Sequence, residues 1–379
     1  MRAFCMEIPT KIYFGRKTWR QALEKEKSIL GGRVLVVTTG GSLRRLGYIE
    51  ELETMLKGLE EEVCFYDKVS PNPELAEIKE AVTLGKECGA ASVIGFGGGS
   101  AIDAAKAAAA GLVCGEPIDS YYFNGNEPKA SLPVIAIPTT AGTGSELSKG
   151  AIISDAKSQL KKGIRGTNLY PKAAIVDSYF TEHIPFKVTM ETGFDVFAHA
   201  IESFISVKAS QFSEMLSLEA VRLTGDNLRR LMDNLDDIKA RENMSYASMI
   251  MGINLGNTGT ALPHRLQYPV GAVTGTGHGA GLLALYPAWL GIEYKHSAGK
   301  MDRVASILSG KDCHGEEESL GEFMKFIEKL SVRQNLKDLG INEDMIGCLA
   351  QRVSGNMKND PAFREADVIQ KIYRQSYQA

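Results

Sequence analysis

The segment SVIGFGGGSAIDAAKAAAA, residues 92–110, decides the fold of the first half of the chain. An apolar, β-favouring run leads through Gly97, Gly98, Gly99 and Ser100 into an alanine-rich stretch that favours helix. Glycines let a backbone approach a pyrophosphate closely, and the first N–H groups of a helix have no internal partner. The segment therefore predicts a strand, a phosphate-binding loop and a helix.

This match to the dinucleotide-binding fingerprint is incomplete. The run GFGGGS places Ser100 where Gly or Ala is usual, and it follows a later strand rather than the first. The structural alternative is that the small residues only allow a helix to pack closely on a sheet.

A second glycine-rich loop follows another apolar run, in IPTTAGTGSELS, residues 137–148. Its hydroxyl groups, on Thr139, Thr140, Thr143 and Ser145, could hold a phosphate or a carboxamide. The alternative is a turn followed by helix capping. Two such loops at strand ends of one parallel sheet favour a nucleotide site in the crevice beyond the carboxyl ends of the strands.

The rest of the first half alternates short apolar runs with amphipathic helical patterns, which predicts βαβ units and a doubly wound parallel sheet of Rossmann-like type. Helices are expected at 42–59 and 73–89. Strands are expected at 33–39, 62–69, 92–98, 132–140 and 173–177.

Beyond Pro185 the strand patterns disappear, and amphipathic helical patterns follow one another. They include 214–235, 243–257, 281–294 and 320–332. We therefore expect two domains: an α/β dinucleotide-binding domain at 1–185 and an all-α metal-binding and substrate domain at 186–379.

Composition narrows the classes of function. A chain of 379 residues is long enough for two hydrophobic cores, and a net charge of −3 gives no electrostatic case for nucleic acid or membrane binding. The six cysteines show no CxxC spacing, which argues against a zinc ribbon, a redox dithiol or a disulfide scaffold. With no export signal or apolar span recognisable, we expect a cytoplasmic protein.

The segment TGFDVFAHAIESF, residues 192–204, carries Asp195 and His199 in an otherwise apolar helical pattern. Residues four apart lie on one helix face, so both side chains can point at one object. A metal ion is one interpretation, and a hydrogen-bonded pair within the core is the other.

Two further histidines favour the metal. His264 and His278 flank a glycine-rich, uncharged stretch, where buried imidazoles are costly unless they bind something. Asp195 with three neutral imidazoles around a divalent ion leaves a local charge of about +1, which suits stabilisation of an alkoxide. The remaining histidines lie in charged surroundings and are expected at the surface: His183, His296 and His314.

The motifs GGGSAIDAAK, PTTAGTGSE, VDSYFTEHIP, TGFDVFAHAIESF and PVGAVTGTGHG occur in this order along nearly the whole chain. This set resembles the iron-containing (group III) alcohol dehydrogenase family. The resemblance implies an N-terminal dinucleotide-binding domain and an all-helical domain with one catalytic divalent metal, usually iron and sometimes zinc.

The resemblance also implies roles for single residues. The metal ligands fall on Asp195, His199, His264 and His278. The cofactor contacts fall on Gly97, Gly98, Gly99, Ser100, Asp103, Thr139, Thr140, Thr143 and Ser145, with Lys161 in the LKKGI run as a further contact.

The chain departs from the family pattern at two positions. Tyr268 stands where members commonly have a second histidine near the substrate, a candidate proton relay, so Tyr268 becomes the candidate catalytic residue. Thr39 follows the first strand where many NAD-preferring members have Asp. Because a carboxylate there would repel a 2′-phosphate, we expect NADPH to be accepted at least as well as NADH, with Arg44 or Arg45 near the phosphate.

The sequence thus predicts a metal-dependent oxidoreductase that interconverts a small alcohol and its aldehyde or ketone with NADP or NAD. The metal would act as a Lewis acid while hydride passes between substrate and nicotinamide. One alternative is a lyase similar to dehydroquinate synthase, which uses NAD and a divalent metal but lacks this Asp-xxx-His pattern. Another is a binding protein without catalysis. We expect a homodimer or higher homo-oligomer.

Overall fold

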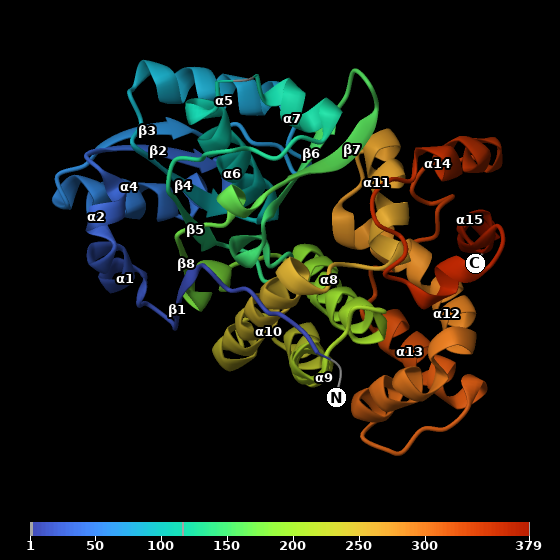
Figure 1. The fold of residues 1–379 in the computed structure, drawn as a ribbon. Helices are drawn as coiled ribbons and strands as arrows, with labels where there is room; N and C mark the ends of the chain where they lie inside the picture. The colour runs from blue at the N-terminus through green and yellow to red at the C-terminus, as the bar shows by residue number, and fades with distance from the viewer. Residues whose placement is uncertain (1–2, 116, 379) are drawn as a thin grey trace. The chain divides into compact units, whose positions relative to one another are not determined.

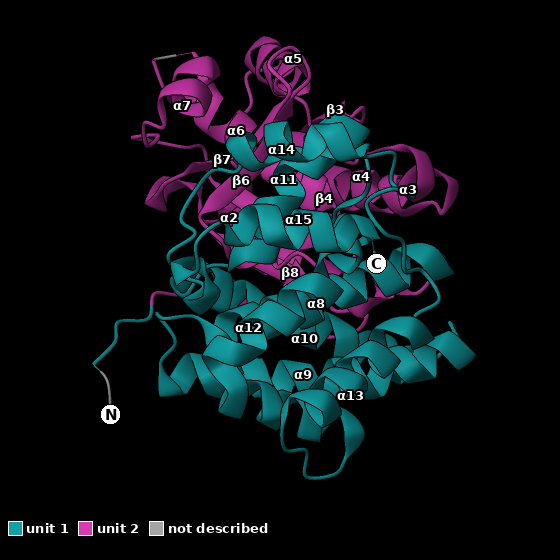
Figure 2. Ribbon diagram, turned by 90° about the vertical axis from the view of Figure 1, so that its right-hand side faces the viewer, with its two compact units in different colours: residues 1–6, 184–379 teal, residues 7–183 magenta. Residues whose placement is uncertain are grey.

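The computed structural model describes residues 3–115 and 117–378, which divide into two compact units (Figure 2). Residues 7–183 form one unit, and residues from Ile184 onward form the other. The described N-terminal residues up to Met6 group with the second unit, whereas the expected α/β domain included them.

A parallel sheet of six strands forms the centre of the unit 7–183, in the order β1-β8-β5-β4-β2-β3 (Figure 1). Its strands are β1 (Lys11–Phe14), β2 (Arg33–Thr38), β3 (Glu62–Tyr66), β4 (Ser92–Gly97), β5 (Val134–Pro138) and β8 (Ala173–Val176). The Rossmann-like prediction and the five expected strands are confirmed. The edge strand β1 was not predicted, because the run KIYF is only four residues long and none of its residues is fully buried.

Helices cover both faces of this sheet, and the alternation of strand side chains creates two cores. Val34 and Val36 of β2 join one core, and Leu35 and Val37 join the other. The helices of this unit are α1 (Trp19–Lys25), α2 (Lys27–Leu30), α3 (Gly41–Arg45), α4 (Tyr48–Gly58), α5 (Leu75–Glu87), α6 (Gly99–Val113) and α7 (Ile118–Asn124), with short 3₁₀ turns at η1 (Ser145–Leu147), η2 (Thr167–Leu169) and η3 (Ser178–Thr181).

Two local features of this unit differ from expectation. The helix expected over 42–59 is divided into α3 and α4 at Gly47, whose φ of 77° lies in the left-handed region that ends a helix. An antiparallel hairpin of β6 (Gly150–Asp155) and β7 (Leu160–Arg165) follows the second glycine-rich loop. Lys161, a predicted cofactor contact, lies on β7.

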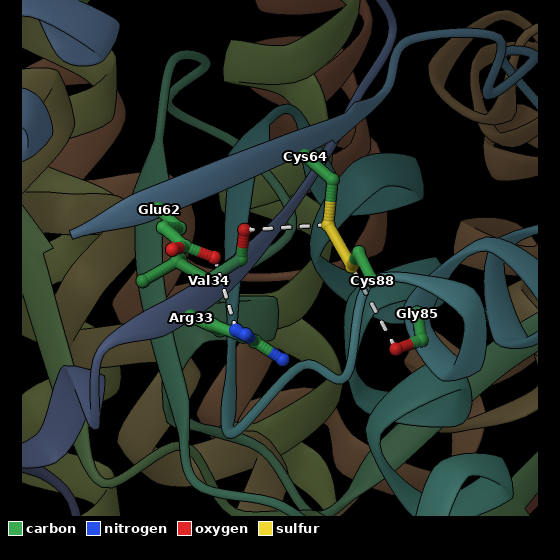
Figure 3. Close-up of a disulfide and its surroundings, with 6 residues drawn as sticks. All are labelled: Arg33, Val34, Glu62, Cys64, Gly85 and Cys88. Carbon is green, nitrogen blue, oxygen red and sulfur yellow. Dashed lines mark hydrogen bonds and ion pairs between the residues drawn. A yellow bond between two sulfur atoms is a disulfide. The ribbon is translucent and has the colours of Figure 1, made fainter.

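A disulfide joins Cys64 on β3 to Cys88, the residue that caps the C-terminus of α5 (Figure 3). The cysteine spacing argued against a disulfide scaffold and did not predict this single bond. Sequence spacing suggested none, because the residues lie 24 apart and only the βα fold brings them together. The described free thiols are those of Cys5, Cys114, Cys313 and Cys348.

The second unit is helical throughout its described part, as predicted. Its long helices are α8 (Phe186–Ile205), α9 (Gln211–Asp233), α10 (Ile238–Asn257), α11 (Leu262–Thr274), α12 (His278–Ser309) and α13 (Glu316–Lys329), followed by η4 (Glu343–Met345), α14 (Ile346–Arg352), η5 (Pro361–Arg364) and α15 (Val368–Gln378). None of the described helices is both long enough and apolar enough to cross a membrane.

Candidate active site

Helix α8 places the first two predicted ligands on one buried face. Asp195 is 2% exposed and His199 is 4% exposed. They are one turn apart, and Nε2 of His199 lies 3.7 Å from Oδ1 of Asp195. The apolar residues around them bury this face in the helical unit, so two polar side chains share an otherwise dry environment.

Two other helices bring the remaining predicted ligands to the same carboxylate. His264 lies in the first turn of α11, with Nε2 at 3.2 Å from Oδ1 of Asp195. His278 is the first residue of α12, with Nε2 at 3.6 Å from the same oxygen. The three imidazole Nε2 atoms thus converge on one oxygen, although their residues are far apart in the sequence.

This geometry fits one divalent cation. Ligand atoms of Asp195, His199 and His264 all lie within 4.8 Å of one another, and all three residues are buried. Metal–ligand bonds of about 2.1 Å place tetrahedral ligand atoms roughly 3.4 Å apart, close to the separations of the three nitrogens from Asp195. Imidazole and carboxylate suit Fe²⁺ and Zn²⁺ alike.

A second set of polar side chains orients two of the rings. Nδ1 of His264 hydrogen-bonds Oε1 of Glu202 at 2.7 Å, and Nδ1 of His278 hydrogen-bonds Oε1 of Gln267 at 2.6 Å. An acceptor at Nδ1 fixes the ring and leaves Nε2 as the coordinating atom. Neither Glu202 nor Gln267 was predicted. Glu202 carried a detectable signal, because it is a carboxylate three residues after His199 in an apolar helix.

The charges of this group depend on one another. Burial alone would raise the pKa of Asp195, but the neighbouring His199, His278 and His264 outweigh burial and hold that pKa well below its usual range. Burial lowers the pKa of His264, whereas Glu202 and Asp195 raise it, to about 10. Without metal, His264 therefore carries a proton at neutral pH that a divalent ion must displace.

Tyr268 lies beside this group on α11. Its ring centroid is 6.2 Å from that of His278, and the residue is 7% exposed. The guanidinium of Arg265 lies over the Tyr268 ring, 5.6 Å from the ring centroid. Tyr268 therefore lies near a predicted ligand, and its catalytic role stays a prediction.

In the α/β unit, the predicted cofactor glycines form the turn between β4 and α6. Gly97 ends the strand with φ of 154°, Gly98 caps the helix, and Gly99 begins it. A Cβ added at Gly99 would lie only 2.5 Å from Oγ1 of Thr143, so a larger residue would push the second loop away. Ser100 donates a hydrogen bond to the Pro71 carbonyl at 2.5 Å.

The second predicted loop packs on the first. The Thr139 amide donates to the Gly97 carbonyl at 2.9 Å, and a Cβ at Gly98 would lie 3.2 Å from Oγ1 of Thr140. The two loops thus meet at the carboxyl edge of neighbouring strands β4 and β5. This is the edge where parallel sheets bind nucleotides.

Asp103 and Ser145 form hydrogen bonds with other residues of the protein. Ser145 donates to Oδ1 of Asp103, and the Ile152 amide donates to Oδ2 at 2.8 Å. The fully buried ammonium of Lys106 lies 2.9 Å from Oδ1 of Asp103 and donates to the Ser145 hydroxyl at 2.7 Å. Their direct contact with a cofactor stays a prediction. Lys106, which the sequence analysis missed, connects α6 to the second loop.

The remaining predicted cofactor residues lie around the same edge. Nζ of Lys161 donates to Oδ1 of Asn72 at 2.8 Å. Thr39 follows β2 and is partly exposed. Arg44, one of two arginines expected near a 2′-phosphate, pairs with Asp67 at 2.9 Å and with Glu50 at 3.3 Å. Arg44 would have to leave these carboxylates to bind a phosphate.

The fold and the site together define a class of protein, a two-domain metal-dependent dehydrogenase. The chain belongs to the iron-containing alcohol dehydrogenase family. Residues 9–178 match the model of "Iron-containing alcohol dehydrogenase", and residues 189–377 match "Fe-containing alcohol dehydrogenase family, C-terminal". It is an NAD(P)-dependent oxidoreductase that interconverts alcohols and aldehydes, and the family uses an iron ion. The lyase alternative finds no support.

The similar proteins span the whole chain. Sulfoacetaldehyde reductase of Bilophila wadsworthia is 31% identical, with 100% of both chains covered. NADPH-dependent butanol dehydrogenase of Clostridium saccharobutylicum is 28% identical and covers 98% of this chain and 97% of its own. The crystal structure of NADH-dependent butanol dehydrogenase A from Thermotoga maritima has a TM-score of 0.90 at 27% identity, with 99% of both chains covered.

Proposed function

We propose that Asp195, His199, His264 and His278 bind one Fe²⁺ ion and that the protein reduces a small aldehyde with NADPH or NADH. The observation that carries this proposal is the convergence of three imidazole Nε2 atoms within 3.2 to 3.7 Å of Asp195 Oδ1. A bound divalent ion supplies Lewis-acid polarisation of a carbonyl group, and the reduced nicotinamide supplies hydride.

The chain's own residues prepare this chemistry. Glu202 and Gln267 accept at Nδ1 of two histidines and so direct each Nε2 toward Asp195. The buried setting of Asp195 and His264 excludes water and strengthens electrostatic interactions. Tyr268 offers a phenol hydroxyl beside His278, suited to donating a hydrogen bond to the substrate.

Replacing Tyr268 by Phe tests this last role. A hydrogen bond from the phenol hydroxyl to the substrate is worth roughly 1 kcal/mol, or about a fivefold change in kcat/KM. We expect Tyr268→Phe to lower kcat/KM by that factor and to alter the pH profile of reduction. Steady-state kinetics from acid to alkaline pH measure both. Identical kinetics and pH profile would leave Tyr268 with a packing role only.

The glycine turn between β4 and α6 supports the proposed cofactor site. The N–H groups of the first turn of α6 have no partner within the helix, and together with the helix dipole they favour a pyrophosphate. We include Gly97, Gly98, Gly99, Ser100, Thr139, Thr140 and Thr143 in this site, with Asp103, Ser145 and Lys161 as supporting residues.

The choice between NADPH and NADH is tested at Thr39. A carboxylate near a 2′-phosphate costs about 1 to 4 kcal/mol, which corresponds to roughly fivefold to several hundredfold in selectivity. We expect wild type to accept NADPH at least as well as NADH, and Thr39→Asp to shift the ratio of kcat/KM toward NADH by that factor. Thr39→Ser is the matched neutral control. A wild type with strong NADH preference, or an unchanged ratio in Thr39→Asp, would refute the role of Thr39.

The substrate, compartment and assembly belong to the proposal as well. One relative is named for a two-carbon aldehyde with a sulfo group and another for butanol, so we propose short-chain aldehydes as substrates. We also propose a cytoplasmic homo-oligomer, tested by cell fractionation and by light scattering of the purified protein.

A panel of short aldehydes tests the activity itself. We expect loss of absorbance from the reduced nicotinamide with at least one aldehyde, its abolition after metal removal by a chelator, and its return with Fe²⁺. Zn²⁺ in a parallel sample separates the two candidate ions. Turnover that persists in fully metal-free protein would contradict the proposal.

A further inference from the structure

Arg265 is a buried cation next to the candidate metal centre. It follows the predicted ligand His264 directly in α11 and is 6% exposed. Within the described part of the chain, its buried Nε finds no hydrogen-bond partner, and no carboxylate pairs with its guanidinium. Arginine is always charged, and a buried charge is costly unless it is paired.

The contacts that Arg265 does make do not neutralise it. Its guanidinium lies 5.6 Å from the Tyr268 ring centroid, a cation–π contact worth about 0.5 to 2 kcal/mol, which is less than the cost of burying a charge. On another side, a Cβ at Gly355 would lie 3.3 Å from Nη1. The side chain is therefore held in one place by the Tyr268 ring and the Gly355 backbone, with its charge unpaired.

The position of this charge connects it to the reaction centre. Arg265 contacts Tyr268, and the Tyr268 ring lies 6.2 Å from the His278 ring. When a divalent ion is bound, the buried carboxylates of Asp195 and Glu202 balance its two charges. Arg265 then remains as an unpaired positive charge in contact with Tyr268, one residue along the chain from the predicted ligand His264.

We propose that Arg265 is an anion-binding, specificity-determining residue, and that the substrate is a short aldehyde with a terminal oxyanion group such as a sulfonate, carboxylate or phosphonate. This inference rests on the proposed function. The planar guanidinium matches the oxygens of such a group and binds it through charge-assisted hydrogen bonds. The ligand supplies the missing partner, and the carbonyl at the other end of the short chain lies toward the metal centre.

Arg265→Met separates this role from a structural one, because methionine keeps the apolar stem and removes only the charge. We expect kcat/KM for an aldehyde with a sulfonate on the adjacent carbon to fall by about 100-fold, mainly through KM, since removing one partner of a buried charged pair has an effect of this size. For propanal, the neutral aldehyde, we expect a change below about threefold. Carboxylate and phosphonate analogues show which oxyanion is preferred.

Stability gives a second readout. Removing an unpaired buried charge should leave Tm unchanged or raise it, whereas loss of a structural pair would lower it. We also expect 2-hydroxyethanesulfonate to raise the Tm of wild-type holoprotein through binding, and not that of Arg265→Met. Arg265→Lys, which keeps a charge without the planar fork, should retain part of both effects. Arg222→Gln on exposed α9 controls for net charge, because Arg222 pairs with Glu219 at the surface.

The outcomes are distinguishable. Equal losses on sulfonated aldehyde and propanal, a wild type without preference for anionic aldehydes, or a large drop in Tm for Arg265→Met would overturn the inference and leave the proposed function intact. A wild type that reduces no aldehyde overturns the proposed function. In that case, the rise in Tm with 2-hydroxyethanesulfonate tests Arg265 independently of activity. A rise in wild type that is lost in Arg265→Met supports the anion site, and no rise in wild type refutes it.

Discussion

Replacing either His264 or His278 by alanine is expected to lower metal occupancy strongly and to reduce kcat/KM by about 1,000-fold or more, since Lewis-acid stabilisation is worth several kcal/mol. Each variant removes one of three nitrogens that lie within 3.7 Å of Asp195 Oδ1. The effect on occupancy should be greater for His264, which is 2% exposed in its side chain, than for His278 at 26%. Elemental analysis of the purified variants and steady-state kinetics measure the two effects.

His296→Ala is the matched control for this experiment. His296 lies on α12 as His278 does, but it pairs with Glu365 near the surface at 2.9 Å. Its variant should retain metal and activity. Unchanged metal occupancy in both His264→Ala and His278→Ala would show that these residues do not form the metal site.

The affinity of the protein for its metal is expected to depend on pH, and the direction of this dependence follows from the pKa of His264. The pKa of His264 is raised to about 10 in the metal-free protein, so below that pH a metal must displace its proton. Metal affinity should therefore rise with pH, by about tenfold per pH unit if one proton is released. Titration of metal-free protein with Fe²⁺ under anaerobic conditions at several pH values measures this slope. An affinity independent of pH would show that His264 binds metal without losing a proton.

The parts of the structure that follow local rules could be predicted from the sequence. Strands such as β2 and β4 are buried on both faces and appear as continuous apolar runs. The Asp195 and His199 pair follows from helical periodicity, and the other two histidines stand out because their surroundings are uncharged. The proximity of these side chains could be predicted for this reason, and their role as metal ligands stays a prediction.

The parts that depend on tertiary contacts could not be predicted. Lys106 is a cation in an alanine-rich helix, and only the fold shows that Asp103 and Ser145 surround it. The Cys64–Cys88 disulfide depends on the meeting of β3 with the end of α5. The β6–β7 hairpin is stabilised by pairing across the turn, and its residues carry mixed polarity that gives no clear period.

Glu202 is another residue whose contacts could not be predicted, because its partners lie on other helices. Replacing it is expected to have a large effect on metal affinity and on stability. Glu202 is fully buried, and its two oxygens serve different elements. Oε1 holds Nδ1 of His264 and accepts from the Tyr286 hydroxyl at 3.1 Å, while Oε2 accepts from the Ala261 amide at 2.6 Å, immediately before α11 begins. One carboxylate therefore fixes both the ring of a predicted metal ligand and the start of its helix.

Glu202→Gln keeps the size of this side chain but supplies one amide donor in place of an acceptor. We expect metal affinity to fall by about 10- to 100-fold, the usual effect of losing a partner that orients a ligating histidine. Glu202→Ala leaves the Ala261 amide and Nδ1 of the buried His264 without this acceptor and should cost about 3 to 5 kcal/mol of the free energy of unfolding. Metal titration and chemical denaturation of the metal-free proteins measure these two effects separately.

Gln267→Leu provides the matched comparison, because Gln267 holds Nδ1 of His278 but does not contact the start of α11. It should weaken metal binding with a smaller loss of stability, since His278 is the more exposed ring. If Glu202→Gln retained wild-type metal affinity while lowering stability, Glu202 would only support the helix. If it lowered affinity without changing the stability of the metal-free protein, its main contribution would be the orientation of His264, as the hydrogen bond at 2.7 Å indicates.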